Sequence, residues 1–200
     1  MLQDKFYTLC QNFTSDKELS KNLWIEIKTS YSDPNRYYHT LKHLEYIYTS
    51  LENIEIDSVI EFSIFYHDII YDVKKNNNEE KSAFLAKKRL AELNVSQKIQ
   101  NEVFELILKT KTHQTTSQKD SLFLDADLTI LASPKKIYQN YIYNIRKEYT
   151  LYSDKVYNNG RKEVLKFFLK QERLYSSDYF HRRYEKIARK NLESELKSLS

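Results

Sequence analysis

Residues 57–71 read DSVIEFSIFYHDIIY, and this stretch decides the fold. Apolar side chains fall on nearly every side of a helix built from it, a pattern typical of a helix buried in the middle of a bundle. Asp57 is a suitable N-cap, so we expect a helix over the whole stretch. The apolar run is too short to span a membrane, and it contains Glu61, His67 and Asp68.

Outward from this stretch, apolar residues recur every three or four positions along almost the whole chain, which is the helical period. The sequence therefore predicts an all-α fold, a single bundle of about eight to ten helices. On the N-terminal side we expect one helix capped by Ser15 or Asp16 and another that begins near His39. On the C-terminal side we expect one helix to begin at 79–80 and another at Ser96, followed by a short helix over about 127–131. A further helix should begin at 134 and end at a Gly160 cap, and two more should cover about 161–172 and 178–198.

The composition points the same way. The 200 residues include one glycine and two prolines, whereas β-sheets need tight turns that depend on both residue types. A β-sandwich, a barrel and a glycine-rich nucleotide loop are therefore excluded. Because no linker or change of composition divides the chain, we expect one domain over residues 1–200.

The cysteine count and the net charge indicate the compartment and the kinds of partner to expect. Cys10 is the only cysteine, which excludes an internal disulfide and a multi-cysteine zinc site and fits a reducing compartment. The first residues lack the apolar core of a signal peptide, so we expect a cytoplasmic protein without a membrane segment. The net charge of +4 is too small to indicate nucleic-acid binding. Ten Lys or Arg against four Asp or Glu within 161–190 fit a solvated face of two helices, with nucleic-acid binding the less favoured alternative.

Histidines and an aspartate gather near the apolar stretch. His67 and Asp68 lie within it, where burial of an unpaired carboxylate costs several kcal/mol. Either a hydrogen-bonded core pair or a divalent cation would explain them. His39 and His43 are four positions apart, so on a helix they share one face and strengthen the metal interpretation. Thr40 stands where a zincin metalloprotease has its glutamate base, so a protease is set aside.

Three segments, in this order, resemble the HD superfamily of metal-dependent phosphohydrolases: YHTLKH at 38–43, FYHD at 65–68 and ADL at 126–128. That superfamily binds a divalent metal through His … His-Asp … Asp on a helical scaffold. RYYH at 36–39 and LDADL at 124–128 resemble an uncharacterised bacterial branch with RxYHxxxH, FHD and LDADL segments. The resemblance covers about residues 36–131, and the helices of 134–200 would complete an HD-type bundle.

The resemblance implies one divalent metal ion, held by His43, His67, Asp68 and Asp127. Nitrogen and oxygen ligands together suit Mn²⁺, Fe²⁺, Zn²⁺, Co²⁺ or Ni²⁺, and spacing does not choose among them. His113 could serve a second ion. An oxygenase of this superfamily needs two extra histidines before the last aspartate, whereas only His113 lies there, so oxygenase chemistry is not expected.

The last carboxylate has two candidates. Asp125 and Asp127 point about 200° apart on a helix, so only one should face the metal. The family pattern A-D-x-L favours Asp127. Asp125 would then cap a helix or orient a ligand.

The resemblance also implies catalytic roles. The segment at 38–43 is similar to the Y-H-N-x-x-H-A signature of cyclic-nucleotide phosphodiesterases, which makes His39 the general acid; alternatively, His39 caps or orients a neighbour. Asp72, four residues after Asp68, either orients or deprotonates the attacking water or is a solvated residue at a helix end.

The expected substrate is a nucleotide or another small phosphoester. Arg36, Lys42, Arg146 and Arg161 could each contact its phosphate. A non-catalytic module that keeps the metal for structure, or to hold a nucleotide, is the alternative function. A homo-oligomer is compatible with the sequence.

Overall fold

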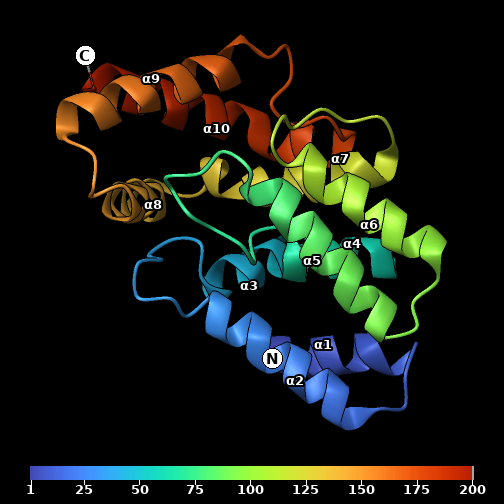
Figure 1. Ribbon diagram of the computed structural model, residues 1–200. Helices are drawn as coiled ribbons and strands as arrows, with labels where there is room; N and C mark the ends of the chain where they lie inside the picture. Colours follow the sequence, from blue (N-terminus) through green and yellow to red (C-terminus); the bar gives the residue numbers. More distant parts are fainter. Residues whose placement is uncertain (200) are drawn as a thin grey trace. The chain divides into compact units, whose positions relative to one another are not determined.

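The computed structural model describes residues 1–199 and confirms the all-α prediction (Figure 1). This part of the chain forms ten α-helices and one 3-10 helix, and it contains no β-strand. None of the described helices has the length and apolarity that a membrane crossing requires. The chain divides into two compact units, Met1–Gln114 and Thr115–Ser200. The single domain expected over residues 1–200 stays a prediction.

Six helices belong to the first unit, and four helices and the 3-10 helix belong to the second. The first set is α1 (Leu2–Gln11), α2 (Lys17–Ser30), α3 (Leu41–Ser50), α4 (Ser58–Tyr66), α5 (Asn78–Glu92) and α6 (Gln97–Lys109). The second set is α7 (Gln118–Asp127), η1 (Leu128–Ala132), α8 (Lys135–Glu148), α9 (Asp154–Lys170) and α10 (Asp178–Ser198).

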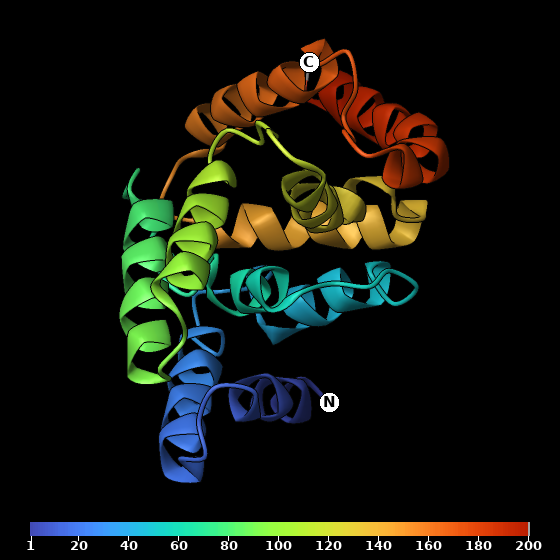
Figure 2. The same ribbon diagram turned by 90° about the vertical axis from the view of Figure 1, so that its right-hand side faces the viewer.

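In the first unit, α4 is the central helix. It packs against α1, α3, α5 and α6, and its Phe62 and Phe65 are fully buried. Asp57 caps it as predicted, by accepting the N–H of Ile60 at 3.1 Å. α5 and α6 run side by side next to it (Figures 1 and 2). Burial on all sides explains why the apolar residues of 57–71 form no single stripe.

The C-terminal end of α4 differs from the sequence prediction. The helix ends at Tyr66 and does not reach Tyr71. Arg36 donates hydrogen bonds to the carbonyl oxygens of Asp68 and Ile69, at 2.7 and 2.9 Å. These bonds satisfy carbonyl groups that a longer helix would pair internally, so the chain can leave the helix here without unpaired buried groups.

The start of α3 also differs from the prediction. The helix begins at Leu41, because Thr40 has an extended backbone (φ −115°, ψ 178°) and occupies the N-cap position. His39 lies in the bend before the helix. The prediction that His39 and His43 share one helix face is therefore wrong, although their ring centroids still lie 5.8 Å apart.

In the second unit, the expected role of Gly160 is wrong. α8 ends at Glu148, and a new helix, α9, begins after the Ser153 cap. Arg146 donates to two carbonyl oxygens of the connecting turn, which stabilises the break between the helices. Gly160 lies in the middle of α9 and does not have a left-handed backbone.

A buried polar cluster joins three helices of the second unit. Arg161 on α9 makes two hydrogen bonds to the Glu195 carboxylate on α10, at 2.6 and 3.0 Å. Tyr138 on α8 donates its hydroxyl to the same carboxylate at 2.5 Å. Both charged side chains are almost completely buried. Arg161 therefore stabilises the packing of α9 against α10, which lie side by side (Figures 1 and 2).

Candidate metal centre

Three side chains converge in the first unit. His43 lies on α3, His67 directly follows α4, and Asp68 is the next residue. Nε2 of His67 lies 3.1 Å from Nε2 of His43 and 3.1 Å from Oδ2 of Asp68. Nε2 of His43 lies 3.8 Å from the same carboxylate oxygen. Among the described residues, this trio is the group whose ligand atoms approach one another closely enough to hold a metal ion.

These separations suit one ion. A first-row divalent metal lies about 2.1 Å from its nitrogen and oxygen ligands. Two such ligands are then about 3.0 Å apart at a right angle and about 3.4 Å apart at a tetrahedral angle. The two distances of 3.1 Å lie within this range and the third, 3.8 Å, lies above it, so a small side-chain shift would bring all three atoms to one ion.

Local packing aims the two histidines. Leu44 and Ile47 are fully buried, which turns the same face of α3 inward and carries His43 with it. Nδ1 of His67 lies 3.0 Å from the carbonyl oxygen of Ile64 and can donate to it only as N–H. When the ring is neutral, this contact leaves the Nε2 lone pair for a metal, which is how backbone carbonyls commonly orient metal-binding histidines.

The backbone of the His-Asp turn is held from two sides. The Asp68 N–H donates to the hydroxyl of Tyr31 at 3.2 Å. Arg36 holds the carbonyl oxygen of the same residue and also donates to the carbonyl oxygen of His39 at 3.3 Å. The Arg36 guanidinium lies 5.0 Å from the Tyr31 ring and 5.5 Å from the Tyr71 ring.

Arg36 is nine-tenths buried, and its hydrogen bonds give it a positioning role that the sequence did not predict. From the sequence, Arg36 could be seen only as a positively charged residue close to His39 and His43 along the chain. Nothing in a local pattern shows that its partners are carbonyl oxygens more than thirty residues away. Contact of Arg36 with a phosphate stays a prediction.

The surroundings favour an ionised Asp68. Burial acts to raise the pKa of this carboxyl, but His67, His39 and His43 outweigh burial and hold the pKa well below its ordinary range. The group is therefore a carboxylate at neutral pH. A divalent ion would find one negative charge and two imidazole nitrogens at the same point.

His39 lies beside the trio but outside it. Its Nε2 is 3.9 Å from Oδ2 of Asp68, and its side chain is 17% exposed. The ring packs against Tyr71, with centroids 4.2 Å apart and planes 32° from parallel. His39 does not belong to the group of mutually close ligand atoms. The general-acid role of His39 stays a prediction.

Other predicted residues of the first unit lie at the surface or in turns. Lys42 is exposed on α3. Asp72 is exposed, and its Oδ1 accepts the N–H of Lys74 at 2.9 Å, so it stabilises a turn. His113 follows α6 with a left-handed backbone (φ 53°) and is not part of the trio. Roles for these residues with substrate, water or a second ion stay predictions.

In the second unit, the two aspartates of LDADL differ in their surroundings. Asp125 is buried, and its two oxygens accept the N–H groups of Ser176 and Ser177 at 2.8 and 2.7 Å. Asp125 thus ties α7 to the start of α10. Asp127, the last residue of α7, is half-buried, and its assignment as the fourth ligand stays a prediction.

Arg146, predicted to contact phosphate, makes contacts within the second unit. Its guanidinium pairs with Asp154 at 2.6 Å and lies 4.8 Å from the ring of Tyr157. These contacts explain its place at the α8–α9 turn. A role in substrate binding stays a prediction.

No protein-family model matches this chain, and searches of curated proteins and of solved structures found no match either. The resemblance to the HD superfamily therefore depends on the three sequence segments, and the structure adds a His-His-Asp cluster of the kind that binds a divalent metal.

Proposed function

We propose that this chain is a divalent-metal-dependent phosphohydrolase of the HD type, which cleaves a nucleotide or another small phosphoester. The observation that carries the proposal is the convergence of His43, His67 and Asp68 on one point. The order of the three sequence segments supports it. When bound, the metal ion would lower the pKa of a water molecule and polarise a phosphoryl oxygen.

The chain's own residues divide the remaining work. His39, close to Asp68 but outside the trio, would give a proton to the leaving oxygen. Asp127 would complete the ligand set, and Asp72 would orient the attacking water. Lys42, exposed one position before a ligand, would contact the phosphate as a point charge.

Metal content is the first test. The purified chain, supplied in turn with Mn²⁺, Fe²⁺, Zn²⁺, Co²⁺ and Ni²⁺, should retain about one ion per chain in elemental analysis. His67→Ala should lose that ion, because it removes the nitrogen closest to both other ligands. His181→Ala is the matched control, since this histidine is half-exposed and contacts Glu185 on its own helix. Retention of no metal by the unaltered chain would refute the proposal.

Turnover is the second test. The loaded chain should release phosphate or nucleoside from at least one member of a panel of nucleotides and phosphomonoesters, and His67→Ala should abolish the release. Metal binding without any turnover across the panel would instead favour the alternative, a non-catalytic module that holds a metal or a nucleotide.

A further inference from the structure

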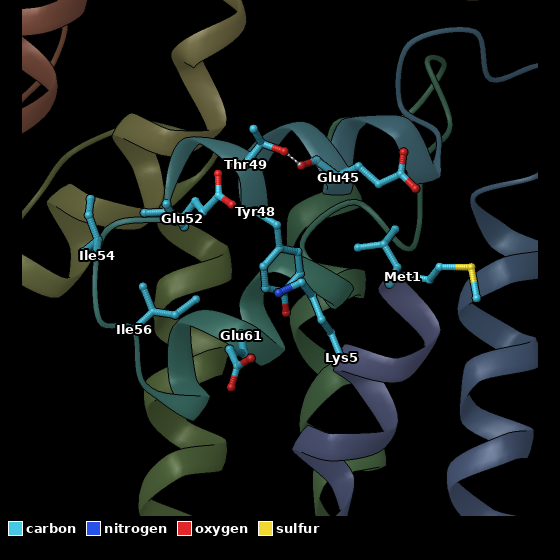
Figure 3. Close-up of a pocket in the computed structure, with 11 residues that line it drawn as sticks. Met1, Lys5, Glu45, Tyr48, Thr49, Glu52, Ile54, Ile56 and Glu61 are labelled. Carbon is cyan, nitrogen blue, oxygen red and sulfur yellow. Dashed lines mark hydrogen bonds between the residues drawn. The ribbon is translucent and has the colours of Figure 1, made fainter.

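A cavity lies within the first unit, on residues that the proposed reaction does not use. Its volume is about 540 Å³, a size common for small-molecule sites. Lys5 of α1, Glu45 and Tyr48 of α3, Glu61 of α4 and the connection between α3 and α4 line it (Figure 3). No ligand of the candidate metal centre is among its lining residues.

The cavity is acidic although the chain as a whole is basic. Glu45, Glu52 and Glu61 line it, whereas Lys5 is its only basic side chain. The structure records no ion pair for any of the three carboxylates within the described residues. The terminal ammonium of Met1, at the rim, is paired with Asp4. The local charge is therefore opposite to the net charge of +4 of the whole chain, and the site favours a cation.

Tyr48 adds a feature that charge alone does not explain. It is more than nine-tenths buried, and its hydroxyl has no hydrogen-bond partner among the described residues. Figure 3 shows the hydroxyl end of the ring directed toward Glu61, with the Lys5 side chain crossing the ring. A buried hydroxyl without a partner costs free energy, and a ligand group bound here would relieve that cost.

The Tyr48 ring already receives a cation from within the chain. The Lys5 ammonium lies 4.8 Å from the ring centroid, the arrangement of a cation–π contact. Lys5 itself is exposed, and its ammonium also attracts the Glu61 carboxylate. The ring face therefore suits an ammonium group, and Lys5 would compete with a ligand for it.

The spacing of the carboxylates selects the kind of cation. Glu45, Glu52 and Glu61 do not form a group close enough to share one metal ion, since the only such group in residues 1–199 is the trio at the candidate metal centre. Apolar side chains of Ile54 and Ile56 also line the cavity. A matching ligand carries several positive groups on an apolar chain.

We propose that this cavity binds a linear aliphatic polyamine. Its ammonium groups would pair with the three glutamates and with the face and hydroxyl oxygen of Tyr48, and its methylene chain would lie along the isoleucines. The proposal is independent of the proposed phosphohydrolase, because it involves none of the residues assigned to that reaction.

Isothermal titration of the full chain with spermidine tests this proposal. At about 0.15 M salt, where weak surface attraction is screened, we expect saturable binding of one spermidine per chain with a Kd below about 1 mM. Mg²⁺ at the same charge concentration should not displace it, and butane-1,4-diol should not bind. Absence of saturable spermidine binding under these conditions would overturn the proposal.

Variants locate the site. Glu61→Gln and Glu52→Gln should each weaken spermidine binding about tenfold, the equivalent of one lost charge contact. Tyr48→Phe should also weaken it, without lowering stability, because the lost hydroxyl has no partner within the described residues. Lys5→Gln should strengthen binding, since it removes a competing ammonium.

Matched controls separate the cavity from net charge. Glu55→Gln changes charge in the same connection but outside the lining, and Lys98→Gln does so at an exposed site on α6. Both should leave the spermidine affinity unchanged. If Glu55→Gln weakens binding as much as Glu61→Gln does, the attraction belongs to the surface as a whole and the cavity is not the site.

Discussion

Nε2 of His43 and Nε2 of His67 lie 3.1 Å apart, although 24 residues separate the two histidines along the chain. Because Nδ1 of His67 faces the carbonyl oxygen of Ile64, the neutral His67 ring presents an acceptor at Nε2. His43 can then donate its own Nε2 proton to that acceptor, or both nitrogens can turn their lone pairs to a cation. Metal binding therefore requires the neutral His43 tautomer that carries its proton on Nδ1.

His39→Asn should separate proton transfer from metal binding. General acid catalysis contributes about 10²–10⁴-fold, so kcat should fall by that factor while metal content stays unchanged. The loss should be smaller with a nitrophenyl ester, whose leaving group hardly needs a proton. Steady-state kinetics and elemental analysis on the same preparation check this. Loss of the metal from His39→Asn would make His39 a ligand.

Asp125 and Asp127 should respond differently to alanine. Asp125→Ala removes the acceptor of two backbone N–H groups that lead into α10, so stability should fall by about 1–3 kcal/mol with metal content retained. Asp127→Ala should lose the metal with little change in stability. Urea denaturation and elemental analysis distinguish the two. A reversed pattern would make Asp125 the ligand.

Arg36→Lys should weaken metal binding without unfolding the chain. The lysine keeps the charge but cannot hold the carbonyl groups of His39, Asp68 and Ile69 together. Groups that orient metal ligands typically contribute 10–100-fold to affinity, so a loss of about that size is expected in a competition titration. Arg146→Lys, which breaks a similar set of carbonyl contacts at the α8–α9 turn, should leave metal affinity unchanged. An unchanged affinity in Arg36→Lys would contradict the positioning role.

Glu195→Gln should strongly destabilise the second unit. It leaves the Arg161 guanidinium buried without its counter-charge, and breaking a buried pair costs about 3–5 kcal/mol. The triple variant Tyr138→Phe, Arg161→Met, Glu195→Leu should recover most of that loss, because it leaves neither a buried charge nor a Tyr138 hydroxyl without its acceptor. Chemical denaturation measures both. A small effect of Glu195→Gln would mean that water reaches this pair.

Glu185 should make stability depend on acid pH. Burial tends to raise the pKa of its carboxyl, but the N–H groups of Leu174 and Tyr175 and the Arg189 guanidinium lower the pKa below its ordinary value of 4.5. A lowered folded-state pKa stabilises the fold above the ordinary value, and this contribution disappears as pH falls through the folded-state pKa.

Urea denaturation between pH 7 and pH 3 measures the Glu185 effect. The stability difference between the unaltered chain and Glu185→Gln should be largest near neutral pH and should shrink in acid. Glu193→Gln, at an exposed site on the same helix, is the control and should change stability little at any pH. A difference for Glu185→Gln that stays constant with pH would contradict the assignment.

The sequence by itself determined the all-α class, the central position of α4 and several helix starts. These features depend on short-range chemistry. The spacing of apolar residues specifies the helical period, and side chains such as Asp57 and Ser96 cap the N–H groups a few residues further on. The residue types of the candidate metal ligands were also readable, because a His-Asp pair in an apolar stretch needs a partner.

Local pattern was insufficient where a helix end depends on a distant residue. α4 stops at Tyr66 because Arg36, more than thirty residues earlier, takes the carbonyl groups beyond it. Gly160 suggested a helix end, but Arg146 and Ser153 place the break before it, and glycine is tolerated inside α9.

Only the tertiary structure decided which of the predicted site residues meet. It placed His43 next to His67 and Asp68, with His39 beside them in a bend. It also showed that both oxygens of Asp125 accept backbone N–H groups at the start of α10. The acidic cavity at Tyr48 likewise had no signal in the sequence, since its glutamates come from separate elements. Such meetings depend on how helices pack through contacts between residues far apart in the chain, whereas periodicity and capping report only on neighbours within a few residues.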